Sequence, residues 1–337
     1  MASVVSCLSD HLAAEKAQSR ELVFVRFFLS DAQNQAVALR QALRPSNAGT
    51  GLPLWDTDQP FAWRGGYAIV EQPPLDGSRI AALVWTSDQA DRYLFHSLRL
   101  TEEEAAGKTS YEQSLLLFDK YLGIIRPLGL DIKTHCIRTW IYVRDIDSNY
   151  AGLVKARNDV FAEEGLSHDT HYIASTGIGG ANEVRSAVVA IDLLTAPGIV
   201  EEDKTYLKAL SHLSPTHDYG VAFERGVRVK DHIFISGTAS IDHKGRILHE
   251  GDVLAQADRL LENIGALLAE GGLAGLPSAA GQAAVPYFII YLRDISDYAK
   301  VDAYMQTRFP DTPRIILEAR VCRPGWLIEM ECETSLR

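Results

Sequence analysis

The chain has 337 residues and a formal net charge of −11, with 47% hydrophobic and 23% charged residues. This composition predicts folded domains of ordinary size and excludes wholesale disorder. An acidic chain lacks the basic surface with which a general nucleic-acid binder replaces counterions. No apolar run approaches the ~20 residues that cross a bilayer, and residues 1–7 do not resemble a secretory signal. We therefore expect no nucleic-acid partner and no membrane span.

The cysteines and histidines indicate neither disulfides nor a metal site. The four cysteines contain no C-x-x-C pair, and His168-x-x-His171 has no further ligand at a useful spacing. A reducing cytoplasm is the expected compartment. The four are Cys7, Cys136, Cys322 and Cys332.

In chain order, the first predicted elements are a strand over residues 25–31 and a helix over residues 33–43. The Pro- and Gly-containing stretch from Leu43 to Gly66 predicts a connecting loop. Further elements follow up to about residue 200. They are strands at 80–85 and 92–96, a helix at 111–128, a strand ending near 146 and a helix at 150–163.

The same order of elements recurs in the last third of the chain. Tyr142 and Tyr291 lie 291 − 142 = 149 residues apart, as do Asp145 and Asp294. Each Asp ends a predicted strand, as Asp31 does in a fainter copy, and suits the N-cap of the next helix. The later copy has a strand at 232–237, a turn at 242–245, a helix at 253–268, a strand at 289–295 and a helix at 298–308.

These repeats predict an α/β (α+β) protein. The repeating unit is strand, strand, helix, strand, helix, strand, which places two helices on one face of a mixed sheet. We expect a partial strand–helix copy over residues 1–60 and two tandem domains over residues 61–200 and 201–337. By alignment of the two copies, Glu329 corresponds to Ala190, so one copy has kept an acid that the other lacks.

Tyr219, residues 234–237 and residues 328–331 belong to a set of motifs in the last 120 residues that keep the order and spacing of a known family. On these motifs the last 120 residues resemble Rid/YjgF proteins, which have a chorismate-mutase-like fold. This resemblance implies that Tyr219, Arg314 and Glu329 line a cleft that processes imines or enamines. Free-standing Rid proteins form trimers with sites between subunits, which implies a pseudo-trimeric monomer or a homotrimer here. The resemblance rests on Tyr219, residues 234–237, Gly251-Asp252, Gln256, residues 261–263, residues 292–294 and residues 328–331.

The middle of the chain resembles the amino-terminal half of chorismatases. The matching motifs are Arg138-Thr139-Trp140-x-Tyr142-Val143 and residues 176–179, which extends the resemblance over residues 80–337. It implies that Glu329 protonates the enolpyruvyl methylene of chorismate. Gly237 and Cys322 match the branch that forms hydroxybenzoate. Ile141 replaces the usual Asn, and Arg314 is a Rid-type residue.

Chorismate is a dicarboxylate with an enol ether. Its site therefore requires cations for the two carboxylates and a protonated acid for the enol ether. Glu329 lies in a predicted core strand, where burial raises the pKa of a carboxyl group. Arg314 and Arg138 are the expected carboxylate ligands, because a guanidinium binds a carboxylate through two hydrogen bonds. No cofactor or metal is expected. The remaining predicted contacts are Tyr219, Trp140, Tyr142, Cys322, Gly237 and the backbone at Gly177 and Gly179.

Two alternatives remain at this point. Arg314 favours an imine deaminase of the Rid type, and the same fold also serves non-catalytic proteins that bind small ligands. If Glu329 and Arg314 share a cleft with Arg138 or Trp140, a dicarboxylate substrate is favoured. If Arg138 points to solvent, the deaminase is favoured.

Overall fold

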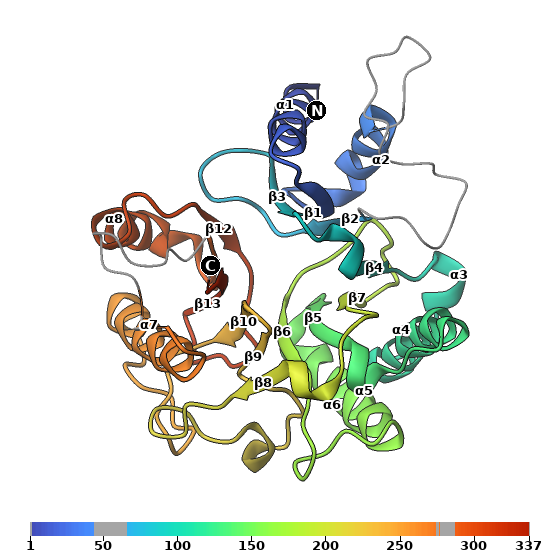
Figure 1. Cartoon of the computed structure of the whole chain (residues 1–337). Coiled ribbons are helices and arrows are strands. Elements are labelled where there is room, and N and C mark those ends of the chain that lie inside the picture. Colours follow the sequence, from blue (N-terminus) through green and yellow to red (C-terminus); the bar gives the residue numbers. More distant parts are fainter. Residues whose placement is uncertain (1, 44–65, 274–275, 277–286, 337) are drawn as a thin grey trace.

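The structure is a computed structural model that describes residues 2–43, 66–273, 276 and 287–336. Most of the loop predicted between Leu43 and Gly66 lies outside these residues. The described strands form three sheets that surround a common centre, with the helices on the outside (Figure 1). No helix in the described ranges is long and apolar enough to cross a membrane.

The first sheet is built from the amino-terminal part of the chain. Its strand order is β2-β1-β3, with β1 parallel to β2 and antiparallel to β3. Two helices, α1 and α2, accompany it, of which the sequence predicted only the second. The elements are α1 (Ala2–Ala17), β1 (Glu21–Leu29), α2 (Ala32–Leu43), β2 (Gly66–Glu71) and β3 (Ile80–Ser87).

The second sheet has the order β4-β7-β5-β6, and again a parallel pair (β5 and β6) adjoins an antiparallel pair (β5 and β7). Capping boxes at Thr101 and Thr109 begin its first two helices. Its elements are β4 (Leu94–Leu98), α3 (Glu102–Ala105), α4 (Ser110–Ile125), α5 (Ile132–His135), β5 (Cys136–Val143), α6 (Ile146–Glu163), β6 (Ala174–Gly179) and β7 (Val189–Thr195).

The third sheet has six strands in the order β12-β11-β13-β10-β9-β8. The side chain of Asp252 caps the first of its two long helices by accepting from the backbone N–H of Leu254 and Ala255. Its elements are β8 (Lys204–Leu207), η4 (Thr216–Tyr219), β9 (Gly226–Val229), β10 (His232–Thr238), α7 (Val253–Glu270), β11 (Tyr287–Leu292), η5 (Ile295–Asp297), α8 (Tyr298–Arg308), β12 (Arg314–Glu318) and β13 (Ile328–Ser335).

The three sheets share one pairing scheme, and the mixed sheets with two helices on one face are confirmed. The strands β2-β1-β3, β6-β5-β7 and β12-β11-β13 occupy equivalent places. The first sheet therefore repeats only the second half of the unit. The strand at residues 80–87 pairs with β1, whereas the sequence assigned it to the copy that begins near residue 61.

The strand registers agree with the alignment of the copies. Tyr142 pairs with Ala190 across β5 and β7, and Tyr291 pairs with Glu329 across β11 and β13. Of the expected N-caps, Asp31 and Asp294 accept hydrogen bonds from Asn34 and Ser296. Asp145 is different: it adopts a left-handed conformation, with φ 46°, and its side chain makes no capping hydrogen bond.

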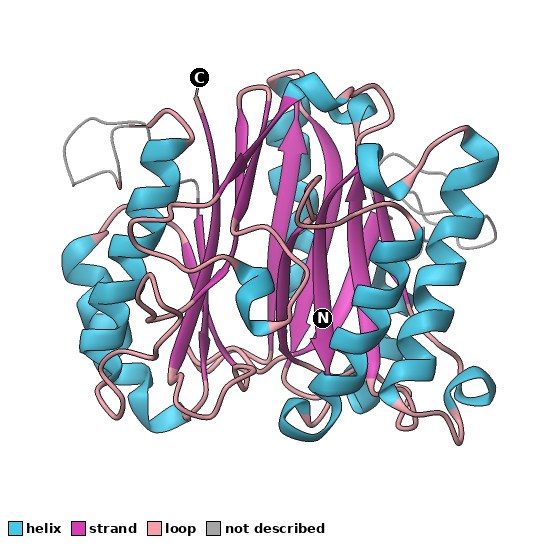
Figure 2. Ribbon diagram, turned by 90° about the horizontal axis from the view of Figure 1, so that it is seen from below, coloured by secondary structure: helices cyan, strands magenta, loops and turns pink. Residues whose placement is uncertain are grey.

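Alternate residues of each strand point to opposite faces of the sheet, which separates the helix-covered face from the centre. On β1, Val25, Phe27 and Leu29 pack with α1 and α2, whereas Phe24 and Phe28 belong to the central core. Seen from the side, the strands form the inner layer and the helices the outer layer (Figure 2). The central faces of the units meet at the interfaces between them, so a site shared by two units is expected at such an interface.

Candidate active site

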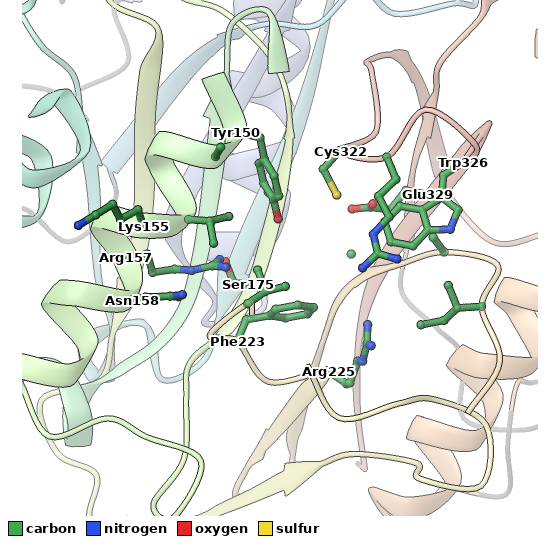
Figure 3. Close-up of a pocket in the computed structure, with 18 of the residues that line it drawn as sticks. Tyr150, Lys155, Arg157, Asn158, Ser175, Phe223, Arg225, Cys322, Trp326 and Glu329 are labelled. Carbon is green, nitrogen blue, oxygen red and sulfur yellow. The ribbon is translucent and has the colours of Figure 1, made fainter. Parts of the chain in front are cut away.

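A cavity of about 530 Å³ lies between the second and third sheets. Helix α6 and strand β6 form one wall, and the loops before β9 and β13 together with β10 form the other (Figure 3). Of the predicted site residues, four line this cavity: Glu329, Gly177, Gly237 and Cys322.

Glu329 projects from the inner face of β13 into this cavity, and its side chain is buried. Burial, followed by the nearby charge of Glu331, raises the pKa of Glu329 to about 8, against the opposing effect of Arg138 and Arg225. Removal of water disfavours the charged form of a carboxyl group. At neutral pH Glu329 is therefore a neutral acid that can donate a proton.

Gly237 leaves the space that the Glu329 carboxyl occupies. A Cβ atom at position 237 would lie 2.9 Å from Cδ of Glu329 and closer still to Oε1. The backbone N–H of Gly237 donates to Oγ1 of Thr176 at 2.9 Å, which fixes β10 against β6. A side chain at position 237 would therefore displace the Glu329 carboxyl group from the position it occupies.

The side chains of Tyr150 and Cys322 come from different units but lie next to each other, and both are close to Glu329 (Figure 3). The ring of Tyr150 packs over Gly177, where an added Cβ would lie 3.3 Å from Cε2. Burial, and then the charge of Glu329, raises the pKa of the Cys322 thiol to about 12. Cys322 is therefore a neutral thiol at the wall of the cavity.

Two buried arginines that the sequence analysis missed line the cavity. Arg157 comes from α6 and Arg225 from the segment before β9, and their guanidinium groups lie 5.9 and 5.2 Å from the centre of the Phe223 ring. Arg225 also donates to the carbonyl oxygen of Ser214 at 3.0 Å. Lys155 is a further cation in the lining. An anionic ligand is the natural occupant of such a cavity.

The sequence does contain a signal for Arg157. On α6 the residues Leu153, Arg157 and Phe161 follow each other at intervals of four, and all three are buried. An arginine in an apolar helical stripe is a signal because arginine is almost never fully buried unless its charge is paired. The repeat does not reveal Arg157, because this arginine is not among the residues that the two copies share.

The comparisons with known proteins agree with this fold. The family model for endoribonuclease L-PSP matches residues 215–335. A RutC family protein of Pyrococcus abyssi is 30% identical over 111 residues, which cover 32% of this chain and 82% of that protein. The chain belongs to the RutC family.

The resemblance to chorismatases is confirmed as well. A 3-hydroxybenzoate synthase of Streptomyces hygroscopicus is 28% identical over 218 residues, 58% of this chain, and the chain spans 62% of the length of that protein. A crystal structure of a chorismatase superposes with a TM-score of 0.65 at 19% identity, covering 93% of each chain. The fold is therefore that of a chorismatase, in which the RutC family region forms the carboxyl-terminal part.

Arg314, the arginine expected from the RutC family, is absent from the lining of the cavity. It binds Asp302 and Gln306, each at 2.8 Å. On β12 it pairs with Phe288, and the equivalent pair in the second sheet is Thr139 with Ser175. The second sheet thus presents Ser175 to the cavity where the RutC family region carries an arginine.

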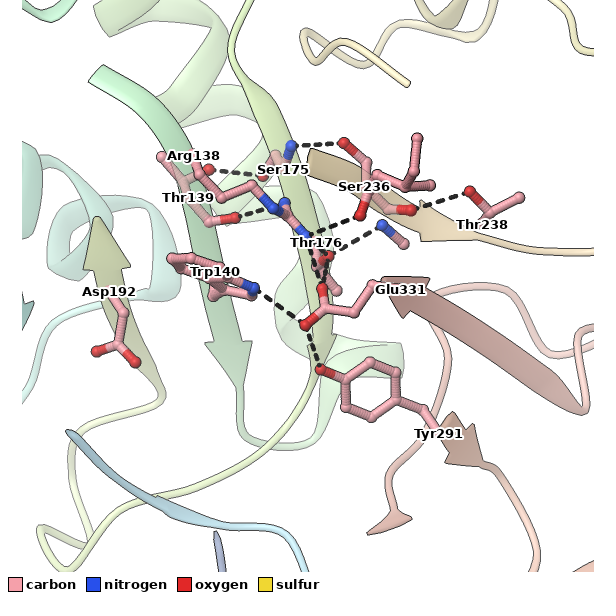
Figure 4. Close-up of polar contacts among 12 residues, drawn as sticks. Arg138, Thr139, Trp140, Ser175, Thr176, Asp192, Ser236, Thr238, Tyr291 and Glu331 are labelled. Carbon is pink, nitrogen blue, oxygen red and sulfur yellow. Dashed lines mark hydrogen bonds and ion pairs between the residues drawn. The ribbon is translucent and has the colours of Figure 1, made fainter. Parts of the chain in front are cut away.

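Three predicted residues from β5 lie behind the cavity, in the central core. Arg138 forms an ion pair with Glu331 at 2.6 Å, and the indole N–H of Trp140 donates to Glu331 at 3.0 Å (Figure 4). The ring of Tyr142 lies 6.0 Å from the guanidinium of Arg26. Arg138 therefore points neither to solvent nor into the cavity.

Gly179 and Tyr219 are the last two predicted residues. Gly179 donates its N–H to the carbonyl oxygen of Arg320 at 2.8 Å, and a Cβ there would lie 2.8 Å from the backbone nitrogen of Arg320. It serves close packing between units. Tyr219 is the last residue of η4, and its side chain lies outside what the structure describes.

Proposed function

We propose that this protein is a chorismatase-type enzyme, which cleaves the enolpyruvyl ether of chorismate and releases pyruvate. The observation that carries the proposal is a buried Glu329, whose pKa burial raises to about 8, in a cavity that two buried arginines line. The named relatives, a 3-hydroxybenzoate synthase and a chorismatase, support it.

In this mechanism Glu329 transfers its proton to the terminal CH₂ of the enolpyruvyl group. The ether carbon becomes an oxocarbenium-like centre, water adds to it, and the Glu329 carboxylate takes up the proton that this water releases. The resulting hemiketal collapses to pyruvate and a dihydroxycyclohexadiene acid. Loss of water from that acid gives a hydroxybenzoate. A positioned acid of this kind contributes on the order of 10²–10⁴ in rate.

Arg157 and Arg225 are the proposed ligands of the two substrate carboxylates. They replace Arg314 and Arg138 in this role, since those two lie outside the cavity lining and pair with Asp302 and Glu331. Because both new candidates are buried beside an aromatic ring, water competes weakly with the carboxylates for the guanidinium groups.

For the product, we propose a hydroxybenzoate. Gly237 and Cys322, the two residues that match the hydroxybenzoate-forming branch, line the cavity beside Glu329. The curated relative named a 3-hydroxybenzoate synthase supports the same branch. The deaminase alternative loses support, because it depends on Arg314 facing the acid.

The test is to incubate the purified protein with chorismate, follow pyruvate by a coupled assay and separate the aromatic products by chromatography. Pyruvate release that Glu329→Gln lowers by at least about 100-fold would support the proposal. Lys155→Met, at an exposed position in the lining, is the control for a general change of cavity charge. If the wild type releases no pyruvate from chorismate, the proposed function is wrong.

A further inference from the structure

Three glutamates occupy alternate positions on the inner face of β13. Glu329, Glu331 and Glu333 are 4%, 3% and 6% exposed. Alternate residues of a strand share a face and lie about 7 Å apart along it. Only Glu329 lines the active-site cavity, so the buried carboxyl group next to it has no role in the mechanism proposed above.

Glu331 is held by donors from all three units of the molecule. From the second unit, Arg138 pairs with it at 2.6 Å, Trp140 donates at 3.0 Å and the Thr176 hydroxyl donates as well. The Tyr291 hydroxyl of the third unit donates at 3.2 Å (Figure 4). The Arg26 guanidinium of the first unit lies 4.0 Å away. So many donors stabilise an ionised carboxylate.

The second unit contains a counterpart of Glu331 with an alanine two residues before it on the same strand. Asp192 occupies on β7 the position that Glu331 occupies on β13, since the two residues lie two positions after Ala190 and Glu329. Asp192 is likewise buried and pairs with Arg99 at 2.9 Å and Arg26 at 3.4 Å. The carboxylate is thus kept in both units, but only on β13 does a glutamate stand two residues before it.

We infer that Glu331 is a positioning residue for the reaction: its fixed negative charge, held by Arg138, keeps the neighbouring Glu329 in the protonated form that donates the proton. The inference rests on the proposed function for its kinetic consequence, but the protonation of Glu329 is a property of the protein alone. Arg138 and Trp140, which the sequence assigned to the substrate, act through this carboxylate instead.

The other charged and titratable groups around Glu329 do not replace this effect. Burial raises the pKa of Glu329 most, and the charge of Glu331 raises it next. Arg138 and Arg225 lower this pKa, each by less than Glu331 raises it. The remaining titratable groups of the cavity lining come from α6 and from the loop before β13. They are Tyr150, Lys155, Arg157, Asp159, Cys322 and Arg323.

The test compares the titration of Glu329 in the wild type and in Glu331→Gln. Infrared difference spectra over a pH series report the protonated carboxyl band, which is assigned to Glu329 by its loss in Glu329→Gln. We expect the midpoint to fall by about one pH unit or more in Glu331→Gln. The basic limb of kcat/KM for chorismate should move with it, so that the variant loses about fivefold or more at pH 8 and little at pH 6.

A second variant keeps the test possible if Glu331→Gln does not fold. Glu331→Gln combined with Arg138→Gln removes the ion pair as a whole and leaves no uncompensated buried charge. Its midpoint should also fall, by less than in the single variant, because the opposing charge of Arg138 is lost as well. Asp192→Asn is the matched control: it breaks the equivalent carboxylate and should leave the Glu329 midpoint in place.

The outcomes separate the two proposals. A shifted infrared midpoint in a protein that releases no pyruvate from chorismate would uphold the role of Glu331 and overturn the proposed function. An unchanged midpoint in folded Glu331→Gln and in the double variant would overturn the role of Glu331. A shift of the same size in Asp192→Asn would also overturn it, since the effect would then belong to the whole charge cluster.

Discussion

The carboxyl group of Glu329 occupies the space that a side chain at position 237 would fill. Gly237→Val places two methyl groups against this carboxyl, whose Cδ lies 2.9 Å from the added Cβ. We expect kcat/KM for chorismate to fall by about 100-fold or more, as it does when a positioned acid is lost. Gly198→Ala, which meets no atom within 4 Å, is the control. Activity within threefold of the wild type would contradict the assigned geometry.

The raised pKa of Glu329 also has a thermodynamic consequence. A group that keeps its proton in the folded state up to pH 8 costs stability as the pH rises through the window from its unfolded value, 4.5, to about 8. Glu329→Gln removes this cost. Its free energy of unfolding should match the wild type near pH 4.5 and exceed it by about 2–4 kcal/mol at pH 8.

Denaturant unfolding over a pH series measures this difference. Glu333→Gln provides a matched comparison, because the pKa of Glu333 is raised to about 7, chiefly by burial. Its gain in stability should therefore level off near pH 7 rather than pH 8. A Glu329→Gln variant whose advantage is independent of pH would show that the carboxyl is ionised in the folded protein.

At the residue scale, the sequence indicated the buried glutamate of the cavity but not the two buried arginines beside it. The family resemblance implied Glu329, the repeat added that the other copy has Ala190 at this position, and the predicted core strand implied burial of the carboxyl group. Arg314 matched a family pattern, yet it pairs with Asp302 of helix α8 in its own unit. The three interfaces between the units are similar, and packing between two units decides which of them contains the active-site cavity. The sequence of a single copy does not contain this information.

At the scale of elements, helix α6 positions Arg157 and Tyr150 by packing against α4. Gly152 makes this contact: an added Cβ would lie 2.8 Å from the backbone nitrogen of Tyr111 and closer to Oγ of Ser110. Gly152→Ala should lower the free energy of unfolding by about 1–3 kcal/mol, the usual cost of overpacking. It should also raise KM for chorismate, because the displaced helix carries Arg157.

Gly123→Ala is the control for this variant. It lies on α4, meets no atom within 4 Å, and should stabilise the protein by about 0.5–1 kcal/mol as alanine favours helix over glycine. Thermal unfolding and the initial rate at several chorismate concentrations measure both effects. A destabilised Gly152→Ala with an unchanged KM would show that α6 does not set the position of Arg157 in the site.

Two helices of the third unit were predicted to within two residues, whereas the predicted bounds of β1 and α6 differ by up to four residues. The helix predicted at residues 298–308 is α8, and that at 253–268 is α7 but for two residues. Helix α1 was missed, and β3 was given to the wrong sheet. Local periodicity specifies a strand, whereas its partner is chosen by long-range pairing that periodicity does not contain.

At the scale of the whole molecule, one buried cation joins the three units. Arg26 of the first unit is fully buried, lies 4.2 Å from the ring of Trp140 in the second, and pairs with Asp192 and Glu331. The three pairing schemes are alike, but the charges at the centre are divided among the units. The first unit supplies a cation, the second a carboxylate with cations, and the third a carboxylate.

This division predicts that the chain unfolds as one cooperative unit. Arg26→Met leaves buried carboxylates with less compensation, so the free energy of unfolding should fall by about 3–5 kcal/mol. The loss should appear as a single transition at lower temperature, observed alike by calorimetry, circular dichroism and tryptophan fluorescence. Arg79→Met, at an exposed position, should change stability by less than about 0.5 kcal/mol. An early separate transition in Arg26→Met would show instead that the first unit folds on its own and that the centre is an interface between independent domains.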